Sequence, residues 1–271
     1  MIALTIAGSD SGGGAGIQAD IKTFQELGVF GTSAITALTA QNTVGVHGIF
    51  EVTPDFLKKQ VEAVLSDFDV KVIKTGMLFS EELIEVVVEV VRRYNIPLVV
   101  DPVMIAKGGE SLLQEHAVTA LKTRLLPLTL ICTPNIPEAE VLTGININTE
   151  HDIKIAAEKI LAMGVQYVVI KGGHLKGEIA MDTVYWKDGS FTMTTPRVQT
   201  KDTHGTGCTF SSAITAHIAK GFSVQDAIIE SKKFIHLAIS NPLSIGHGHG
   251  PTNHFAYKRT YESCEVTVHE A

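Results

Sequence analysis

Short runs of apolar and β-branched residues alternate along the chain with longer stretches in which apolar positions recur at helical spacing. The short runs predict strands over residues 2–7, 33–39, 71–75, 97–101, 129–133 and 166–171. The longer stretches predict helices over residues 15–27, 55–66, 80–94, 112–123, 150–163, 206–220 and 224–240. In the first predicted helix, Ile17, Ile21 and Phe24 follow the i, i+4, i+7 spacing of a buried stripe.

This alternation of strands and helices predicts an α/β fold in which helices cover both faces of a mostly parallel sheet. A β-rich segment over 181–195 predicts a small hairpin that turns at Asp188-Gly189. We find no linker, charge run or internal repeat that would divide the sequence. The whole of 1–271 is therefore expected to form a single domain.

Polar residues or glycines follow the predicted strands at their carboxyl ends. Any loop after a strand begins with such residues, so one of them alone carries little weight. The carboxyl ends of parallel strands lie along one edge of a sheet, where ligands bind. Six such ends together favour a ligand site at this edge: Asp10, Gln41, Gly76, Asp101, Asn135 and Gly172.

Composition narrows the classes of function. Hydrophobic residues make up 45% of the chain, which is enough for a sizeable core, and the net charge is −7. The absence of a Lys/Arg cluster excludes a binder of duplex nucleic acid. Cys132, Cys208 and Cys264 form no CxxC pair, which excludes a disulfide framework and a cysteine-rich zinc site. No apolar run approaches about 18 residues and no basic leader is present, so we expect a cytoplasmic protein without a membrane partner.

The segment Thr203-His204-Gly205-Thr206-Gly207-Cys208 opens a predicted helix of small residues. Free amides and the positive end of the helix dipole at this point suit an anion. Cys208 lies in the first turn, where a thiolate is favoured. A tight turn before a closely packed helix explains the same glycines, and the sequence alone leaves both interpretations open.

A second glycine cluster, Gly8 to Gly16, follows the first strand and opens the first helix, as a phosphate loop would. Its spacing matches neither the dinucleotide fingerprint nor the Walker loop. Asp20 lies one turn into that helix, either at the site or as a polar cap.

Two further acids and a histidine run complete the candidate groups. Asp101 and Glu138 follow neighbouring strand ends, where hard carboxylates bind Mg²⁺ directly or through water. Glu138 equally fits a helix N-terminal acid that complements the dipole. The run Gly246-His247-Gly248-His249-Gly250 lacks spaced carboxylates or cysteines, so we interpret it as a structured loop rather than a metal site.

Together these segments resemble the hydroxymethylpyrimidine/phosphomethylpyrimidine kinases of thiamine biosynthesis, members of the ribokinase-like superfamily. The resemblance extends over nearly the whole chain, and its motifs are specific to the family more than to one substrate. The segments that carry it are Ala3–Gly8, Gly8–Asp20, Ala40–Thr43, Lys74–Leu78, Asn135–Glu138, Lys171–His174, Thr203–Cys208 and Gly246–Pro251.

The resemblance implies a three-layer α/β/α fold and two ATP-dependent steps. The first phosphorylates 4-amino-5-hydroxymethyl-2-methylpyrimidine, and the second converts the monophosphate to the diphosphate. It implies pyrimidine contacts at Gly8, Asp20 and Gln41 in a pocket lined by Met77 and Val103.

At the phosphoryl end, the resemblance implies that the amides of Gly205, Thr206, Gly207 and Cys208 cradle the transferring group. Lys171 and Thr203 would lie near the nucleotide phosphates, with Asp101 and Glu138 organising Mg²⁺. Cys208 stands where the sugar kinases of the superfamily have their presumed base, an Asp, and a thiolate there could accept the hydroxyl proton.

Lys107, on a glycine-rich loop, either closes over the second substrate's phosphate or is a surface lysine. A pyridoxal kinase is the nearest alternative function. Some relatives that use pyridoxal have a Cys at the position of Ala106, and alanine here weighs against strong pyridoxal activity. A non-catalytic pyrimidine sensor is disfavoured because the catalytic motifs are intact. Relatives are commonly homodimers, and we expect the contact at an apolar edge near the second strand and its following loop.

Overall fold

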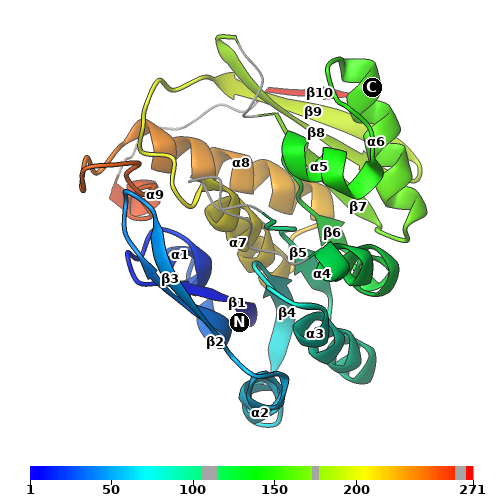
Figure 1. Cartoon of the computed structure of the whole chain (residues 1–271). Helices are drawn as coiled ribbons and strands as arrows, with labels where there is room; N and C mark the ends of the chain where they lie inside the picture. The colour runs from blue at the N-terminus through cyan, green and yellow to red at the C-terminus, as the bar shows by residue number, and fades with distance from the viewer. Residues whose placement is uncertain (105–114, 173–176, 260–266, 271) are drawn as a thin grey trace.

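The computed structural model describes residues 1–104, 115–172, 177–259 and 267–270, in which ten strands form one continuous sheet (Figure 1). The strand order is β10-β9-β8-β7-β6-β5-β4-β1-β2-β3. Adjacent strands from β7 to β2 in this order run parallel, which confirms the mostly parallel sheet. These parallel strands are β1 (Ile2–Asp10), β2 (Phe30–Gln41), β4 (Val70–Thr75), β5 (Leu98–Val100), β6 (Ile131–Cys132) and β7 (Tyr167–Lys171).

Antiparallel strands extend the sheet at both edges. β3 (Val46–Glu51) pairs with β2, while β8 (Ile179–Trp186), β9 (Gly189–Pro196) and β10 (Thr267–Glu270) follow β7. The β8–β9 pair is the predicted hairpin, with a different turn. Trp186 pairs with Gly189, so Lys187 and Asp188 form the turn and Gly189 begins β9.

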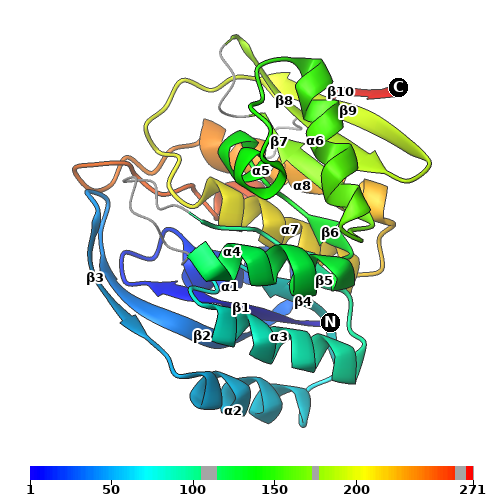
Figure 2. The same ribbon diagram turned by 45° about the vertical axis from the view of Figure 1, so that its right-hand side comes forward.

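Helices cover both faces of the sheet and complete the predicted three layers (Figures 1 and 2). α1 (Gly16–Glu26), α7 (Thr206–Ala219) and α8 (Val224–Ser240) pack on one face, and the short α9 (Ala256–Arg259) lies beside α8. The other face carries α2 (Pro54–Leu65), α3 (Glu81–Tyr94), α4 (Glu115–Ala120), α5 (Ile136–Thr143) and α6 (Glu150–Ala162).

The period-2 geometry of the strands divides most of the core into two large clusters. In β5, Leu98 and Val100 pack with the helices of the α3 side, while Val99 between them packs with α7 and α8. Both faces of the central strands are therefore buried, which explains why the sequence shows continuous apolar runs there instead of an alternation.

Two elements that the sequence did not predict are β3 and α5. β3 is almost entirely exposed, with Phe50 70% accessible, and α5 begins shortly after β6 ends. The structure differs in part from the helix predicted over 112–123. In the described part, α4 is followed by a π-helical turn, Leu121–Leu125, and a 3-10 turn, Leu126–Leu128. No helix among the described residues is long and apolar enough to cross a bilayer.

A buried ion pair joins the sheet to two helices. Lys74 Nζ on β4 lies 2.9 Å from both carboxylate oxygens of Asp20 on α1, and both side chains are fully buried. The hydroxyls of Thr5 on β1 and Ser212 on α7 each donate to Asp20 at 2.5 Å. Burial disfavours the charged ammonium, but Asp20, together with Cys208 and Asp101 nearby, outweighs burial and raises the pKa of Lys74.

We predict that Lys74→Met, which leaves the Asp20 carboxylate buried without its cation, lowers the free energy of unfolding by about 3–5 kcal/mol. Urea denaturation followed by circular dichroism measures this. Lys58→Met is the control, because Lys58 pairs with Glu89 on the exposed surface and should leave the midpoint nearly unchanged. Equal midpoints for the two variants would contradict the prediction.

Candidate active site

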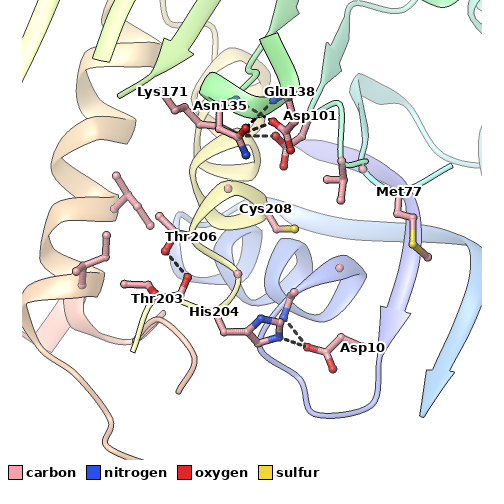
Figure 3. Close-up of a pocket in the computed structure, with 18 of the residues that line it drawn as sticks. Asp10, Met77, Asp101, Asn135, Glu138, Lys171, Thr203, His204, Thr206 and Cys208 are labelled. Atoms are coloured by element: carbon pink, nitrogen blue, oxygen red, sulfur yellow. Dashed lines mark hydrogen bonds and ion pairs between the residues drawn. The ribbon is translucent and has the colours of Figure 1, made fainter. Parts of the chain in front are cut away.

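A pocket of about 800 Å³ opens at the carboxyl ends of the parallel strands, beside the N-terminus of α7 (Figure 3). This is the sheet edge at which the polar strand ends predicted a ligand site. The loops after five strands contribute to its wall. The polar and sulfur-bearing residues that line it include Asp10, Gln41, Met77, Asp101, Asn135, Glu138, Lys171, His204 and Cys208.

Asp10, at the end of β1, organises the glycine loop that precedes α1. Its Oδ1 accepts the Gly12 amide at 2.8 Å, and its Oδ2 accepts the amides of Gly14 at 3.0 Å and Ala15 at 2.9 Å. The His204 ring nitrogen Nε2 lies 2.8 Å from the same Oδ2. Burial alone would raise the pKa of Asp10, but the ring and the loop amides hold it below its ordinary value. An ionised carboxylate thus holds the loop.

The turn before α7 is formed by a glycine in a left-handed conformation. Gly205 has φ +78° and is the N-cap, and a Cβ there would lie 1.7 Å from the carbonyl oxygen of Gly14. Thr206 Oγ1 donates to the Thr203 carbonyl at 2.7 Å. The predicted tight turn and closely packed helix are therefore observed, and the same turn places residues 205–208 in the pocket wall at the positive end of the helix dipole.

Cys208 lies in the first turn of α7, yet its surroundings oppose a thiolate. Burial is the largest cause that raises the pKa of Cys208 to about 11, and the nearby carboxylates of Asp20 and Asp101 add to it. Lys74 and a backbone hydrogen bond from Gly16 act in the opposite direction and are outweighed. The expectation of a helix-terminal thiolate is wrong for this state of the protein, in which Cys208 is a thiol at neutral pH.

Lys171, at the end of β7, lies between two acids. Its Nζ is 2.8 Å from Asp101 Oδ1 and 3.9 Å from Glu138 Oε2. These acids raise the pKa of Lys171 despite its burial. Thr133 Oγ1 also donates to Asp101, at 3.1 Å.

Glu138 forms a capping box with Asn135 at the start of α5. Glu138 N donates to Asn135 Oδ1 at 2.9 Å, and Asn135 N donates to Glu138 Oε2 at 2.8 Å. The helix-terminal interpretation of Glu138 is thus observed. Burial is the main cause that raises the pKa of Glu138 to about 7, with Asp101 adding to it and Lys171 opposing it.

Among the described residues, the carboxylates at this end of the pocket are too few to enclose a metal ion by themselves. No group of three or more His, Cys, Asp or Glu side chains that could hold a metal occurs in the part of the chain that the structure describes. Asp101 and Glu138 both face the pocket, and both also approach Lys171. Mg²⁺ often binds proteins through one or two carboxylates, with water and substrate phosphates completing its shell, and this donor set suits that arrangement.

Most of the predicted site residues meet at this pocket. Gly8, Met77 and Val103 line it together with Gln41, whose Oε1 accepts a hydrogen bond from Thr39 Oγ1 at 3.1 Å. Thr203 and residues 205–208 line it as well. Lys107 lies outside the described residues.

Asp20 does not line the pocket, which corrects the expectation that it contacts the pyrimidine. Its carboxylate is fully buried and both oxygens are occupied by Lys74, Thr5 and Ser212. Asp20 therefore supports the wall from behind.

The sequence placed Asp10 among the strand ends that favour a ligand site but indicated no partner for it, and it indicated no role for His204, although both residues lie within motifs that carry the family resemblance. Asp10 carries a strand-end signal, but the partner of His204 lies 194 positions away and no spacing reveals it. The C-terminal histidine run is the structured loop that we expected. His247 N donates to Thr43 Oγ1 at 3.1 Å, and His249 N donates to the Thr43 carbonyl at 2.8 Å.

Comparison with known proteins agrees with this geometry. A family model described as phosphomethylpyrimidine kinase matches residues 10–253. The chain belongs to the phosphomethylpyrimidine kinase family. It is 54% identical to the hydroxymethylpyrimidine/phosphomethylpyrimidine kinase of Bacillus subtilis, over 95% of this chain and 96% of that protein.

Solved structures of this kinase family and its relatives share the fold. The pyridoxal kinase from Staphylococcus aureus in complex with AMP-PCP and pyridoxal matches with a TM-score of 0.92 and 39% identity, covering 100% of this chain and 99% of that one. The phosphomethylpyrimidine kinase from Clostridium difficile matches with a TM-score of 0.79 and 47% identity, covering 88% of this chain and 99% of that one. The ribokinase-like fold expected from the sequence is confirmed.

We predict that Gly205→Ala destabilises the protein by more than the roughly 1–2 kcal/mol that a left-handed conformation costs an L-residue, because its Cβ meets the Gly14 carbonyl. Gly221→Ala is the matched control, since Gly221 has φ +86° and nothing within 4 Å of an added Cβ. Thermal and urea unfolding of both variants measure the difference. Equal losses of stability would show that the contact with Gly14 is unimportant.

Proposed function

We propose that this chain uses ATP to phosphorylate 4-amino-5-hydroxymethyl-2-methylpyrimidine and then phosphorylates the monophosphate to the diphosphate, for thiamine biosynthesis. The observation that carries the proposal is a single pocket with two different ends. One end has the carboxamide of Gln41 and apolar side chains, and the other has the N-terminus of α7 and Lys171. The Bacillus subtilis relative, whose name states both kinase activities, supports it along nearly the whole chain. The Staphylococcus aureus relative in complex with AMP-PCP supports ATP as the donor.

In this proposal the pyrimidine lies at the end of the pocket formed by β1, β2 and the residues after β4. The carboxamide of Gln41 offers both a donor and an acceptor to an aminopyrimidine edge. Met77 and Val103 supply apolar contact, and the Met77 methyl group packs where a side chain on Gly8 would lie, 2.4 Å from a Cβ there.

The phosphoryl groups lie at the other end, against α7. The amides of residues 205–208 bind the transferring group at the helix N-terminus, and Lys171 and Thr203 contact the nucleotide phosphates. Asp101 and Glu138 would hold Mg²⁺, directly or through water. The ion, when bound, supplies positive charge that neutralises the phosphates.

Cys208 is assigned to accept the proton of the reacting hydroxyl, but its own protonation state limits this role. Because burial keeps it a thiol, Cys208 accepts a proton only after its own has left. Phosphoryl transfer has a loose transition state in which little covalent work falls to the protein. Positioning and charge neutralisation therefore provide most of the rate acceleration in this proposal.

Pyridoxal phosphorylation is the second candidate. It is favoured by the structural match to the Staphylococcus aureus pyridoxal kinase with pyridoxal bound. The higher identity to the Bacillus subtilis pyrimidine kinase favours the pyrimidine as the main substrate. Ala106, the position at which alanine weighs against pyridoxal, lies outside the described residues.

The homodimer expected from the resemblance stays a prediction. The β2–β3 edge, where we expected the contact, exposes Leu38, Val44, Ile49 and Phe50. These apolar side chains support an association surface there.

A coupled assay of ADP formation tests the proposal directly. We predict that ATP consumption depends on the pyrimidine, that product masses show monophosphate and then diphosphate, and that kcat/KM for pyridoxal is lower. Cys208→Ala should lower kcat strongly while leaving pyrimidine affinity nearly unchanged. ATP consumption that responds to pyridoxal but not to the pyrimidine would replace the first candidate with the second.

We further predict an acidic limb in kcat/KM governed by Glu138. With the pKa of Glu138 at about 7, the carboxylate is lost as the pH falls below this value, and with it the charge that attracts Mg²⁺. Activity should therefore drop on the acid side of about pH 7, and Glu138→Gln should be slow with no such limb. Glu140→Gln on the same helix is the control, because Glu140 Oε1 bonds the Ile147 amide. An unchanged limb in Glu138→Gln would contradict this assignment.

A further inference from the structure

The ring of His204 lies where three pocket-forming segments meet. Its Nε2 is 2.8 Å from Asp10 Oδ2 at the end of β1 and 3.4 Å from Gln41 Nε2 at the end of β2. Its Cδ2 packs on Gly14, where an added Cβ would lie 2.5 Å away. Figure 3 shows His204 and Asp10 on one side of Cys208, with Lys171, Asp101 and Glu138 on the other.

The backbone of His204 is held as firmly as its ring. His204 N donates to the Gly250 carbonyl at 3.0 Å, and Thr252 N donates to the His204 carbonyl at 3.1 Å. The next residue is Gly205, which abuts the Gly14 carbonyl. The ring therefore extends from a fixed backbone segment that continues directly into the turn that begins α7.

The direction of the hydrogen bond between His204 and Asp10 determines whether the ring can accept a hydrogen bond from Gln41. Asp10 is an ionised acceptor, so Nε2 of His204 carries the proton and donates it. A protonated Nε2 has no lone pair left to accept a hydrogen from Gln41. The 3.4 Å approach thus restricts the carboxamide by contact while its N–H groups stay available to a ligand, and Thr39 holds its oxygen.

We propose that His204, oriented by Asp10, is a positioning residue that fixes Gln41 relative to the N-terminus of α7. Resting on the proposed function, this means that His204 sets the distance between the pyrimidine contact and the phosphoryl-binding turn. His204 acts through these neighbours and needs no contact with the reacting atoms. Loss of the His204 ring should weaken pyrimidine binding and slow phosphoryl transfer. Binding of the nucleotide phosphates should change little, because Lys171 is unaffected.

The experiment compares three substitutions of His204 by steady-state kinetics. His204→Ala should raise KM for the pyrimidine and lower kcat, with a combined loss on the order of a hundredfold, because small misplacements cost this much. KM for ATP should stay near that of the wild type. His204→Gln should recover most of the loss, since its amide nitrogen reaches the position of Nε2, whereas the shorter His204→Asn should not.

His217→Ala is the matched control for the loss of a buried histidine. His217 lies near the other end of α7 and bonds Ser231 Oγ through Nδ1 at 3.1 Å, away from the pocket. It should lower thermal stability without altering the ratio of the two KM values.

The outcomes separate this inference from the proposed function. Wild-type enzyme that consumes no ATP with the pyrimidine would refute the proposed function and this inference with it. Active wild-type enzyme with His204→Ala resembling His217→Ala would overturn the inference alone. If His204→Ala does not fold, equal kinetics in His204→Gln and His204→Asn would overturn it, and rescue by Gln only would support it.

Discussion

The buried carboxylate of Asp20 is the contact on which the rest of the site depends. It joins α1, β1, β4 and α7 at one point through Lys74, Thr5 and Ser212. Ser212 lies one helical turn beyond Cys208, so this contact sets how far the first turn of α7 projects toward the pocket. A charge without water is tolerable only when its partners are complete, and here a cation and two hydroxyls surround it.

The same arrangement explains how an acidic chain prepares a pocket for anions. The site gathers its positive potential from a helix N-terminus and from Lys171, not from a basic surface. Asp101 and Glu138 hold Lys171 in its charged form, and Asp20 does the same for Lys74. The carboxylates that add to the negative net charge thus keep the useful cations in place.

Local periodicity and strand ends were sufficient to predict the sheet and much of the pocket wall. Lys171, Asp101 and Gln41 reach the pocket because each ends or follows a strand, and parallel strands align such residues without further information. The role of Asp20 could not be predicted in this way, because its helix position fits a residue that contacts the ligand as well as one that supports the pocket wall. Its ion pair with the buried Lys74 decides between these roles. Cys208 failed as a thiolate for a similar reason. Its helix position favours the anion, but burial of the thiol outweighs this effect, and the carboxylates of Asp20 and Asp101, distant in sequence, add to burial.

The rim of the pocket is joined by bonds between residues at opposite ends of the sequence. Thr43 bonds the backbone of residues 247–249, and His204 bonds residues 250 and 252. During synthesis the chain emerges from its N-terminus, and long-range contacts form last. The six parallel strands are complete by residue 171, but the rim also needs residues 247–252, which are synthesised much later. The residues of the parallel strands are therefore all synthesised well before the residues that complete the rim of the pocket.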